Sequence, residues 1–235
     1  MAALFNCRNI NRISTGLPSE NSRGSINASL LLLAGGQGSR MGGKNKLYLE
    51  IGGVLLLERI LTRISFLFHE IVLLVGPGEV RAAEKYLAGL INKWGIILIE
   101  DRHYGHGPLE GLYRGLTCMK EEWGFLLGCD MPVPQEKVIR AMYNFCSCYT
   151  DAVAAEIGGY IEPLHAFYRR SCKMPVDAAL AREDRKIKQF YDDIRLTIVK
   201  EDILREYKNY SDSFFNLNTP HDLAKIGLSE KAAYE

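Results

Sequence analysis

The chain has 235 residues, 47% of them hydrophobic, which is enough to form the core of one globular domain. The length would barely suffice for two independent domains. Its formal net charge of +1 argues against nucleic-acid binding as the main function, because such surfaces carry a concentrated basic excess. No apolar run approaches the ~18 residues that a membrane-spanning helix requires.

The first 26 residues are polar and contain three arginines but no acidic residue before Glu20. This composition has a faint likeness to a transit peptide, but we expect a flexible leader over residues 1–26. The six cysteines include no C-x-x-C pair, and Cys146 and Cys148 are badly spaced for a zinc site. We therefore expect reduced, buried thiols in a cytoplasmic protein.

Apolar runs and helical patterns alternate from residue 29 to about residue 156, which predicts repeated strand and helix units around a mainly parallel sheet. We expect one domain over residues 27–228, a single-domain, Rossmann-like α/β fold with three layers, and a tail over residues 229–235. The expected strands are 29–33, 70–75, 95–100, 124–128 and 152–157, with added strands at 161–169 and 196–200. The expected helices are 54–68, 79–94, 109–122 and 135–146, with short helices within 173–191.

Ligands of such a sheet bind beyond the carboxyl ends of its parallel strands. The loops after residues 33, 75, 100 and 128 should therefore meet at one place. The most informative of them belongs to residues 31–46, LLLAGGQGSRMGGKNK, in which a short apolar strand leads into five glycines. Glycines leave backbone N–H groups free to close around an anion, so we expect a phosphate-binding loop. Its expected nucleotide contacts are Leu33, Ala34, Gly35, Gly36, Gly38 and the basic Arg40, Lys44 and Lys46.

Two common glycine motifs do not fit this loop. The P-loop pattern G-x-x-x-x-G-K-[ST] is nearly matched by Gly38, Gly43 and Lys44, but Asn45 stands where a magnesium-binding hydroxyl is required. The dinucleotide pattern G-x-G-x-x-G finds Met41 in place of its third glycine, so a nicotinamide or flavin site is disfavoured.

What remains, L-A-G-G-x-x-x-R-M-G-x-x-x-K, resembles the nucleotide-binding loop of the sugar-phosphate and cofactor nucleotidyltransferases. Within that group the chain is most similar to the molybdenum cofactor guanylyltransferases, which attach GMP to molybdopterin. The resemblance runs over about residues 26–226 in five ordered motifs, and it implies a nucleotide-diphospho-sugar transferase fold of the GT-A-like kind.

Asp130 follows the predicted strand 124–128, within the sequence C-D-M-P. A carboxylate there can hold Mg²⁺, or it can serve as the N-cap of the helix near Gln135. The resemblance implies that Asp130 is the metal-binding aspartate of the family. It also implies that Arg40 and Lys46 are catalytic together with Asp130. For the phosphate contact, Lys44 is the rival of Lys46, and Arg40 has an alternative role as a brace within the loop.

Asp101 lies in a segment that matches E-D…G-P-L-x-G in the family, where the aspartate helps to bind the nucleotide. It can accept hydrogen bonds from the base or ribose, or it can be a solvated loop carboxylate. His103 and His106 are not interpreted as metal ligands, because no clear third ligand accompanies them. The segment 75–78 departs from the family, which often offers an Asn to guanine there.

Two later segments match family motifs that lie beside the acceptor, P-L-x-A-x-Y and F-x-N-x-N-T-P. The resemblance implies acceptor contacts from Pro163 and His165. Asn216 and Asn218 alternate along a short extended piece, so both amides can face the site.

These motifs together imply Mg²⁺-dependent transfer of GMP from GTP to molybdopterin, with release of pyrophosphate. The acceptor phosphate is itself a nucleophile, so catalysis requires alignment and charge stabilisation and no Ser, Cys or His nucleophile. The resemblance implies molybdenum-cofactor insertion or chaperone proteins as partners, and we expect a monomer without nucleic-acid or membrane partners. Two alternatives stay open: a cytidylyltransferase for molybdopterin or a polyol phosphate, whose loop more often reads L-A-A-G, and a nucleotide-binding regulatory protein without turnover.

Overall fold

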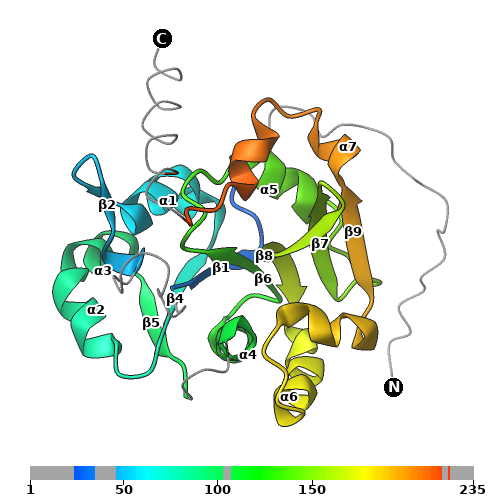
Figure 1. Ribbon diagram of the computed structural model, residues 1–235, viewed down its shortest axis with the longest axis horizontal. Helices are drawn as coiled ribbons and strands as arrows, with labels where there is room; N and C mark the ends of the chain where they lie inside the picture. The colour runs from blue at the N-terminus through cyan, green and yellow to red at the C-terminus, as the bar shows by residue number, and fades with distance from the viewer. Residues whose placement is uncertain (1–23, 35–45, 103–106, 219–221, 223–235) are drawn as a thin grey trace, which may run out of the picture.

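A seven-stranded sheet forms the centre of the protein (Figure 1). The computed structural model describes residues 24–34, 46–102, 107–218 and 222. The strand order is β5-β4-β1-β6-β8-β7-β9. β8 runs antiparallel to both neighbours, and the other pairings are parallel, which confirms the predicted α/β fold with a mainly parallel sheet. The strands are β1 (Ala28–Leu33), β4 (Glu70–Val75), β5 (Ile97–Glu100), β6 (Trp123–Gly128), β7 (Ala152–Ile157), β8 (Tyr160–Arg169) and β9 (Leu196–Lys200).

The central strand β1 is buried along its whole length, as is typical of a parallel strand covered on both faces. Its side chains alternate between two apolar clusters. Leu30 and Leu32 belong to one cluster, and Leu31 and Leu33 belong to the other. This alternation makes the three-layer sandwich that the sequence predicts.

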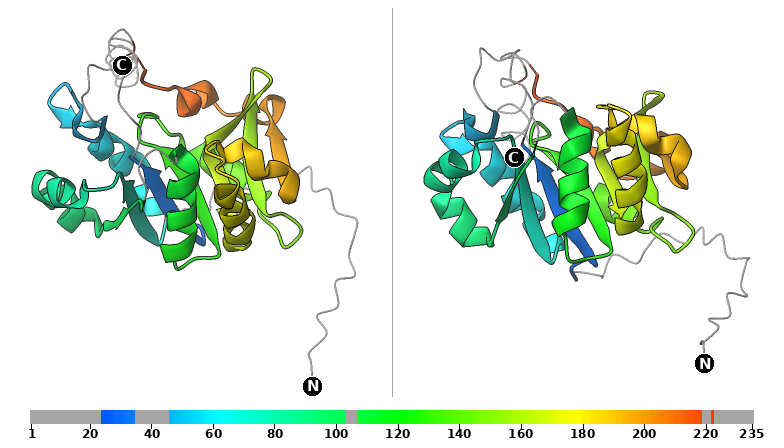
Figure 2. Two further views of the ribbon diagram at one scale, coloured as in Figure 1. Left: turned by 60° about the horizontal axis from the view of Figure 1, so that its bottom comes forward. Right: turned by 90° about the horizontal axis from the view of Figure 1, so that it is seen from below.

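Two helical layers cover the sheet, and Figure 2 shows α4 and α6 together in front of it when the molecule is seen from below. One layer contains α1 (Leu56–Ile64), α2 (Val80–Tyr86), α3 (Ala88–Trp94) and α5 (Glu136–Tyr143). The other contains α4 (Gly107–Cys118), α6 (Lys173–Ala181) and η4 (Ile187–Asp193). The remaining elements are η1 (Lys46–Tyr48), β2 (Glu50–Ile51), β3 (Val54–Leu55), η2 (Ser65–Leu67), η3 (Arg170–Cys172), α7 (Glu201–Leu204) and η5 (Tyr210–Phe214).

Several predicted element boundaries were wrong, two of them where glycines turn the chain. Val54 belongs to the β2–β3 hairpin and not to a helix, because Gly52 and Gly53 turn the chain with φ of 60° and 78°. The helix expected at 79–94 is divided into α2 and α3 at Leu87, whose φ of −108° and ψ of 12° leave the helical range. β5 begins later than expected because Gly95 ends α3 in the left-handed conformation. α4 and α5 also end before residues 122 and 146, at the bounds given above.

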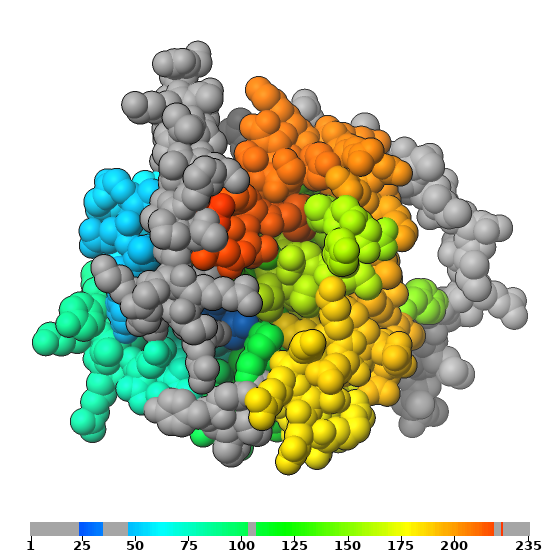
Figure 3. Space-filling view, viewed as in Figure 1, coloured from blue at the N-terminus to red at the C-terminus, as the bar shows by residue number. Residues whose placement is uncertain are grey.

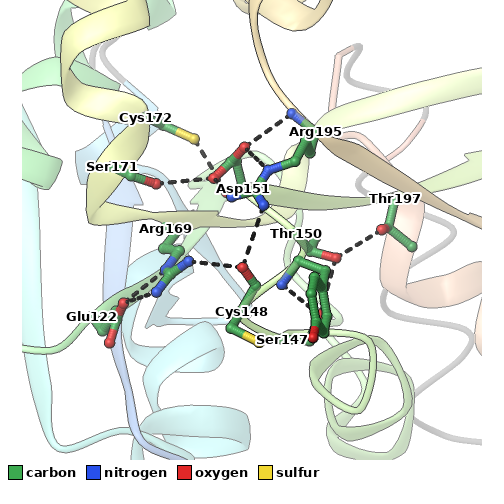
Figure 4. A network of polar contacts seen from close by, with 11 residues as sticks. Glu122, Ser147, Cys148, Thr150, Asp151, Arg169, Ser171, Cys172, Arg195 and Thr197 are labelled. Carbon is green, nitrogen blue, oxygen red and sulfur yellow. Dashed lines mark hydrogen bonds and ion pairs between the residues drawn. The ribbon is translucent and has the colours of Figure 1, made fainter. Parts of the chain in front are cut away.

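A polar network fastens the amino end of β7 to its neighbours (Figure 4). Asp151 accepts two side-chain bonds of 2.8 Å from Arg195 and one of 3.2 Å from Ser171. These bonds, those from Arg195 first, lower the pKa of Asp151 to about 2. Next to it, the hydroxyls of Thr150 and Thr197 lie 3.0 Å apart and link the start of β7 to β9. The network therefore holds together the edge of the sheet that is furthest from β5.

No helix in the described part of the chain is long and apolar enough to cross a membrane. The cysteines of that part are unpaired, as expected of reduced thiols. Cys129 and Cys172 are buried, whereas Cys148 is exposed.

Candidate active site

The parallel strands β1, β4, β5 and β6 end at one edge of the sheet. Their hydrogen bonding continues past the strand ends: the N–H of Ala34 donates to a carbonyl of β4 at 2.9 Å, the N–H of Asp101 to Val75 at 2.9 Å, and the N–H of Cys129 to Leu33 at 3.0 Å. The loops that follow these strands therefore start side by side, as predicted. In Figure 3 the red surface of the last residues before 219 lies above the blue surface of the β1 segment.

Asp130 lies in the turn that follows β6. The N–H of Met131 closes this turn on the Gly128 carbonyl at 3.0 Å, and the Asp130 carbonyl accepts a bond of 2.7 Å from the N–H of Leu217. A Cβ added to Gly128 would lie 2.6 Å from Asp130 Oδ1, so the missing side chain leaves the space in which this carboxylate lies. The alternative role of Asp130 as a helix N-cap is excluded, because Gln135 holds the N-cap position of α5.

Asp101 follows β5 and lies against α4. A Cβ added to Gly111 of α4 would lie 2.2 Å from a methyl carbon of Leu33 and 3.8 Å from Asp101 Oδ1, so the glycine lets the helix pack closely on the strand ends. Asp101 Oδ1 is buried and has no hydrogen-bond partner in the described part of the chain. This buried oxygen does not fit the alternative of a solvated loop carboxylate.

The electrostatics around Asp101 favour its neutral form. Burial, and next the charge of Glu110, raises the pKa of Asp101 to about 7. Glu110 is itself 4% exposed, and its carboxylate accepts a bond of 3.2 Å from the N–H of Arg102. Arg114 opposes the shift from α4, where its Nε donates to the Glu100 carbonyl at 3.1 Å. A buried acceptor without a donor costs ~1–3 kcal/mol, so Asp101 is suited to receive an N–H or O–H group of a ligand.

β8 is irregular where it passes the Asp130 turn. Its register against β7 shifts between Ala154 and Ala155, so residues 163–165 have no partner on β7. A Cβ added to Gly128 would lie 3.6 Å from the side chain of Leu164. This bulge therefore borders the turn after β6, at the same edge of the sheet.

Two side chains satisfy the backbone of the bulge. A Glu162 carboxylate oxygen accepts a bond of 3.1 Å from the N–H of Leu164, and the Tyr168 hydroxyl donates to the Pro163 carbonyl at 2.9 Å. Burial raises the pKa of Glu162, and the charge of Asp130 acts in the same direction. Glu162 is thus a further acid near Asp130 that the sequence argument missed, and its place directly before Pro163 was the one available signal.

His165 lies in the core and not on the surface of the site. Its ring has no exposed area, and Nε2 lies 2.8 Å from Ser213 Oγ. The rings of Phe125 and Phe214 pack against it, with centroid distances of 4.9 Å and 4.5 Å. Burial lowers the pKa of His165 to about 3, so the ring is neutral at physiological pH. In this arrangement Pro163 retains exposed surface for an acceptor, whereas His165 does not.

The N-x-N segment lies beside the Asp130 turn. Leu217 is buried, Asn216 is partly exposed and Asn218 is exposed, as alternation along an extended piece predicts. The bond from the N–H of Leu217 to the Asp130 carbonyl fixes this segment at the site. The N–H of Asn218 donates to the Asp222 carboxylate at 3.1 Å.

Part of the predicted site falls outside the described residues. Lys46 is placed only through its backbone, as the first residue of η1. Leu33 and Ala34 lie at the end of β1 and are buried. In the described part of the chain there is no group of three or more His, Cys, Asp or Glu side chains that could hold a metal ion. The residues singled out in the sequence that lie outside the described part of the chain are Gly35, Gly36, Gly38, Arg40, Lys44, His103 and His106.

Residues 30–198 match the MobA-like NTP transferase domain. The chain belongs to the MobA-like NTP transferase family. This match includes the loop after β1, both aspartates and the β8 bulge. The protein is therefore a nucleotidyltransferase by family, as the resemblance of its glycine loop implies.

Relatives of this MobA-like transferase bear consistent names. A probable molybdenum cofactor guanylyltransferase of Natranaerobius thermophilus is 30% identical over 198 residues, which cover 84% of this chain and 93% of the relative. The crystal structure of molybdopterin-guanine dinucleotide biosynthesis protein A from Archaeoglobus fulgidus is similar with a TM-score of 0.70 and 26% identity, over 86% of this chain and 99% of that one.

A third similarity concerns the fold alone. The 4-diphosphocytidyl-2C-methyl-D-erythritolsynthase of Anaerococcus prevotii is 15% identical, with a TM-score of 0.64 over 87% of this chain and 96% of its own.

Proposed function

We propose that this MobA-like transferase moves GMP from GTP to molybdopterin, with Mg²⁺ and with release of pyrophosphate. The observation that carries the proposal is the convergence of three elements at one edge of the parallel sheet: the Asp130 turn, Asp101 and the segment around Leu217. The start of the glycine loop at Ala34 lies at the same edge. The names of the relatives support the choice of GTP and molybdopterin.

The nucleotide binds, in this proposal, across the ends of β1 and β5. The glycine loop and the charges of Arg40 and Lys46 hold the phosphates, because backbone N–H groups and cationic side chains both stabilise anions. Asp101 accepts a hydrogen bond from the base or ribose through its buried oxygen. This bond would remove the cost of the unpaired acceptor, so ligand binding and relief of a buried polar group occur together.

Asp130 at the β6 end could contribute an oxygen ligand to a divalent cation. Asp130 presents a carboxylate in the space that Gly128 leaves open, and hard cations such as Mg²⁺ prefer oxygen ligands. When bound there, Mg²⁺ would offset the negative charge of the phosphates during transfer. The chain's own contribution is a carboxylate whose backbone is fixed on both sides, by Gly128 and by Leu217.

The chemistry that the chain must support is a displacement at the α-phosphorus. An oxygen of the acceptor phosphate forms the new P–O bond, the bond between the α-phosphorus and the bridging oxygen breaks, and pyrophosphate leaves. The acceptor oxygen is already anionic, so no protein base is needed. Pro163, Asn216 and Asn218 align the acceptor, while Arg40 and Lys46 stabilise the leaving phosphates.

The experiment compares Asp130→Asn with the wild type in a transfer assay with GTP, Mg²⁺ and molybdopterin. We expect the variant to lose transfer and keep its fold, because a partly exposed turn carboxylate becomes an amide of nearly equal volume. Asp177→Asn on the exposed face of α6 makes the same charge change and should keep full activity. Near-normal turnover by Asp130→Asn at ordinary Mg²⁺ would refute the assignment.

Base selectivity is tested by binding. We expect GTP to bind at least about tenfold more tightly than CTP or ATP, because guanine offers the N1–H and N2–H donors while a mismatched base leaves buried polar groups unpaired. Displacement of labelled GTP by an equal concentration of CTP would move the chain to the cytidylyltransferase alternative.

A further inference from the structure

Ser213 and His165 form a buried polar pair that no part of the proposed chemistry uses. Both side chains have no exposed area. Ser213 Oγ lies 2.8 Å from His165 Nε2 and also accepts a bond of 3.0 Å from the backbone N–H of Gln135. One hydroxyl thereby joins three segments that are far apart in the sequence: η5, β8 and the loop between β6 and α5.

The Ser213 hydroxyl can form both of its bonds with either neutral tautomer of the His165 ring. The hydroxyl has one hydrogen, and a lone pair is already used by the N–H of Gln135. With the ring proton on Nδ1, the hydroxyl donates to His165 Nε2; with the ring proton on Nε2, the ring donates to Ser213 Oγ. Nδ1 is buried and has no hydrogen-bond partner in the described part of the chain. The ring is held from other directions by the aromatic rings of Phe125 and Phe214. The pair is therefore a neutral hydrogen-bonded link in an apolar surrounding.

Each segment that the pair joins carries a part of the proposed site. The loop that ends at Gln135 begins with Asp130, and it is fixed at its other end by the bond from Cys129 to β1. The segment that follows Ser213 contains Leu217, whose N–H returns to the Asp130 carbonyl. His165 is the last residue of the β8 bulge. The bonds from Ser213 to His165 and Gln135, together with the bond from Leu217 to Asp130, thus connect the three segments around the Asp130 turn.

We propose that the His165–Ser213 pair is a positioning device that sets the Asp130 turn, the β8 bulge and the N-x-N segment relative to one another. The proposal rests on the proposed function for the identity of the reaction. Neither residue touches a reacting atom, and the predicted acceptor contact of His165 is replaced by this internal role. Loss of the link should displace the Asp130 carboxylate and leave the sheet intact, because the parallel strands are paired independently of it.

The variants are chosen to remove the link without changing the packing. Ser213→Ala deletes the hydroxyl and both of its bonds, and His165→Phe keeps an aromatic ring in the same space but removes the nitrogen. His165→Gln keeps a polar atom within reach of Ser213 and tests rescue. Thr150→Val is the matched control, since it also deletes a buried hydroxyl bond, of 3.0 Å to Thr197, at the far edge of the sheet.

The first readout is the Mg²⁺ concentration that supports half-maximal GTP binding, measured by calorimetric titration. We expect this concentration to rise at least fivefold in Ser213→Ala, by a smaller factor in His165→Phe, and back toward the wild-type value in His165→Gln. The second readout is hydrogen exchange over residues 130–136 and 215–218, which should accelerate in Ser213→Ala. Thr150→Val should change neither quantity.

The outcomes separate this proposal from the proposed function. Wild-type Mg²⁺ dependence in folded Ser213→Ala and His165→Phe would overturn the positioning role. If Ser213→Ala does not fold, His165→Phe and His165→Gln decide the question by the same measurement. If the wild type binds no GTP, the proposed function fails, and the exchange of residues 130–136 and 215–218 still tests the link. Unchanged exchange in Ser213→Ala would then overturn it.

Discussion

Gly128→Ala should damage the site through one identifiable contact. The new Cβ would lie 2.6 Å from Asp130 Oδ1, whereas ordinary contacts begin at 3.4 Å, so the carboxylate must move by the difference, 0.8 Å. The other neighbours of the new atom, two carbons of Leu164, lie at an acceptable 3.6 Å. A misplacement of about 1 Å in a catalytic group can cost on the order of 100-fold in rate, so we expect kcat to fall by roughly 10- to 100-fold.

The stability of Gly128→Ala should change little. The clash is with a side chain that can turn toward solvent, and alanine in a strand is favoured over glycine by roughly 0.5–1 kcal/mol. Gly124→Ala in the same strand is the matched control. There the new Cβ would meet core atoms, Leu31 Cδ1 at 2.7 Å and Met119 Sδ at 2.9 Å.

The control should lose about 1–3 kcal/mol of unfolding free energy through overpacking, and its activity per folded molecule should stay normal. The assays are urea unfolding and steady-state transfer at several Mg²⁺ concentrations. Normal kcat in Gly128→Ala, or an equal loss of kcat in the folded fraction of both variants, would show that the space over residue 128 does not serve Asp130.

Four further substitutions test other parts of the account. Asp151→Asn should lower stability at neutral pH by about 1 kcal/mol, since the ion pair with Arg195 and one of its two bonds are lost at a partly exposed site. Urea unfolding should show this difference shrinking as pH falls from 3.8 toward about 2, where the wild-type carboxylate is protonated. Asp101→Asn should weaken GTP binding. The wild type should lose stability as pH rises from the ordinary carboxyl pKa of 3.8 to the raised pKa of about 7, because the folded state holds a proton on Asp101 that the unfolded state releases. Asp101→Asn should abolish this loss, and parallel pH dependence in both proteins would contradict the prediction. Lys46→Ala should weaken GTP binding in calorimetry by about 1.5–3 kcal/mol and Lys44→Ala by much less, and the reverse order would mean that the loop alignment is displaced by two residues.

Much of the sheet was predictable because its signals are local. The strands 70–75, 152–157 and 196–200 have the predicted bounds, since continuous or alternating apolar runs determine which residues can be buried. The place of Asp101 and Asp130 at one edge followed from the parallel order alone. The start of α1 and the start of β5 were less predictable, because Gly52, Gly53 and Gly95 take left-handed conformations that an apolar pattern does not reveal.

The parts of the site that the sequence did not reveal depend on contacts between distant segments. His165 is buried because residues of β6 and η5 close over it, and nothing near it in the sequence indicates this. Ser213 has no motif of its own, and its role appears only when the loop before α5 and the bulge of β8 are brought together. Glu162 was missed for the same reason, since its proximity to Asp130 arises from the register shift in β8.

The most direct test of the central claim is transfer of labelled GMP by the purified chain. The protein is incubated with molybdopterin, Mg²⁺ and GTP labelled in its α-phosphate. The labelled products are separated and compared with those of a parallel reaction with labelled CTP. The account predicts a labelled molybdopterin guanine dinucleotide and one pyrophosphate for each product, with at least about tenfold less product from CTP. Labelled product from CTP and none from GTP, or no labelled product from either, would contradict it.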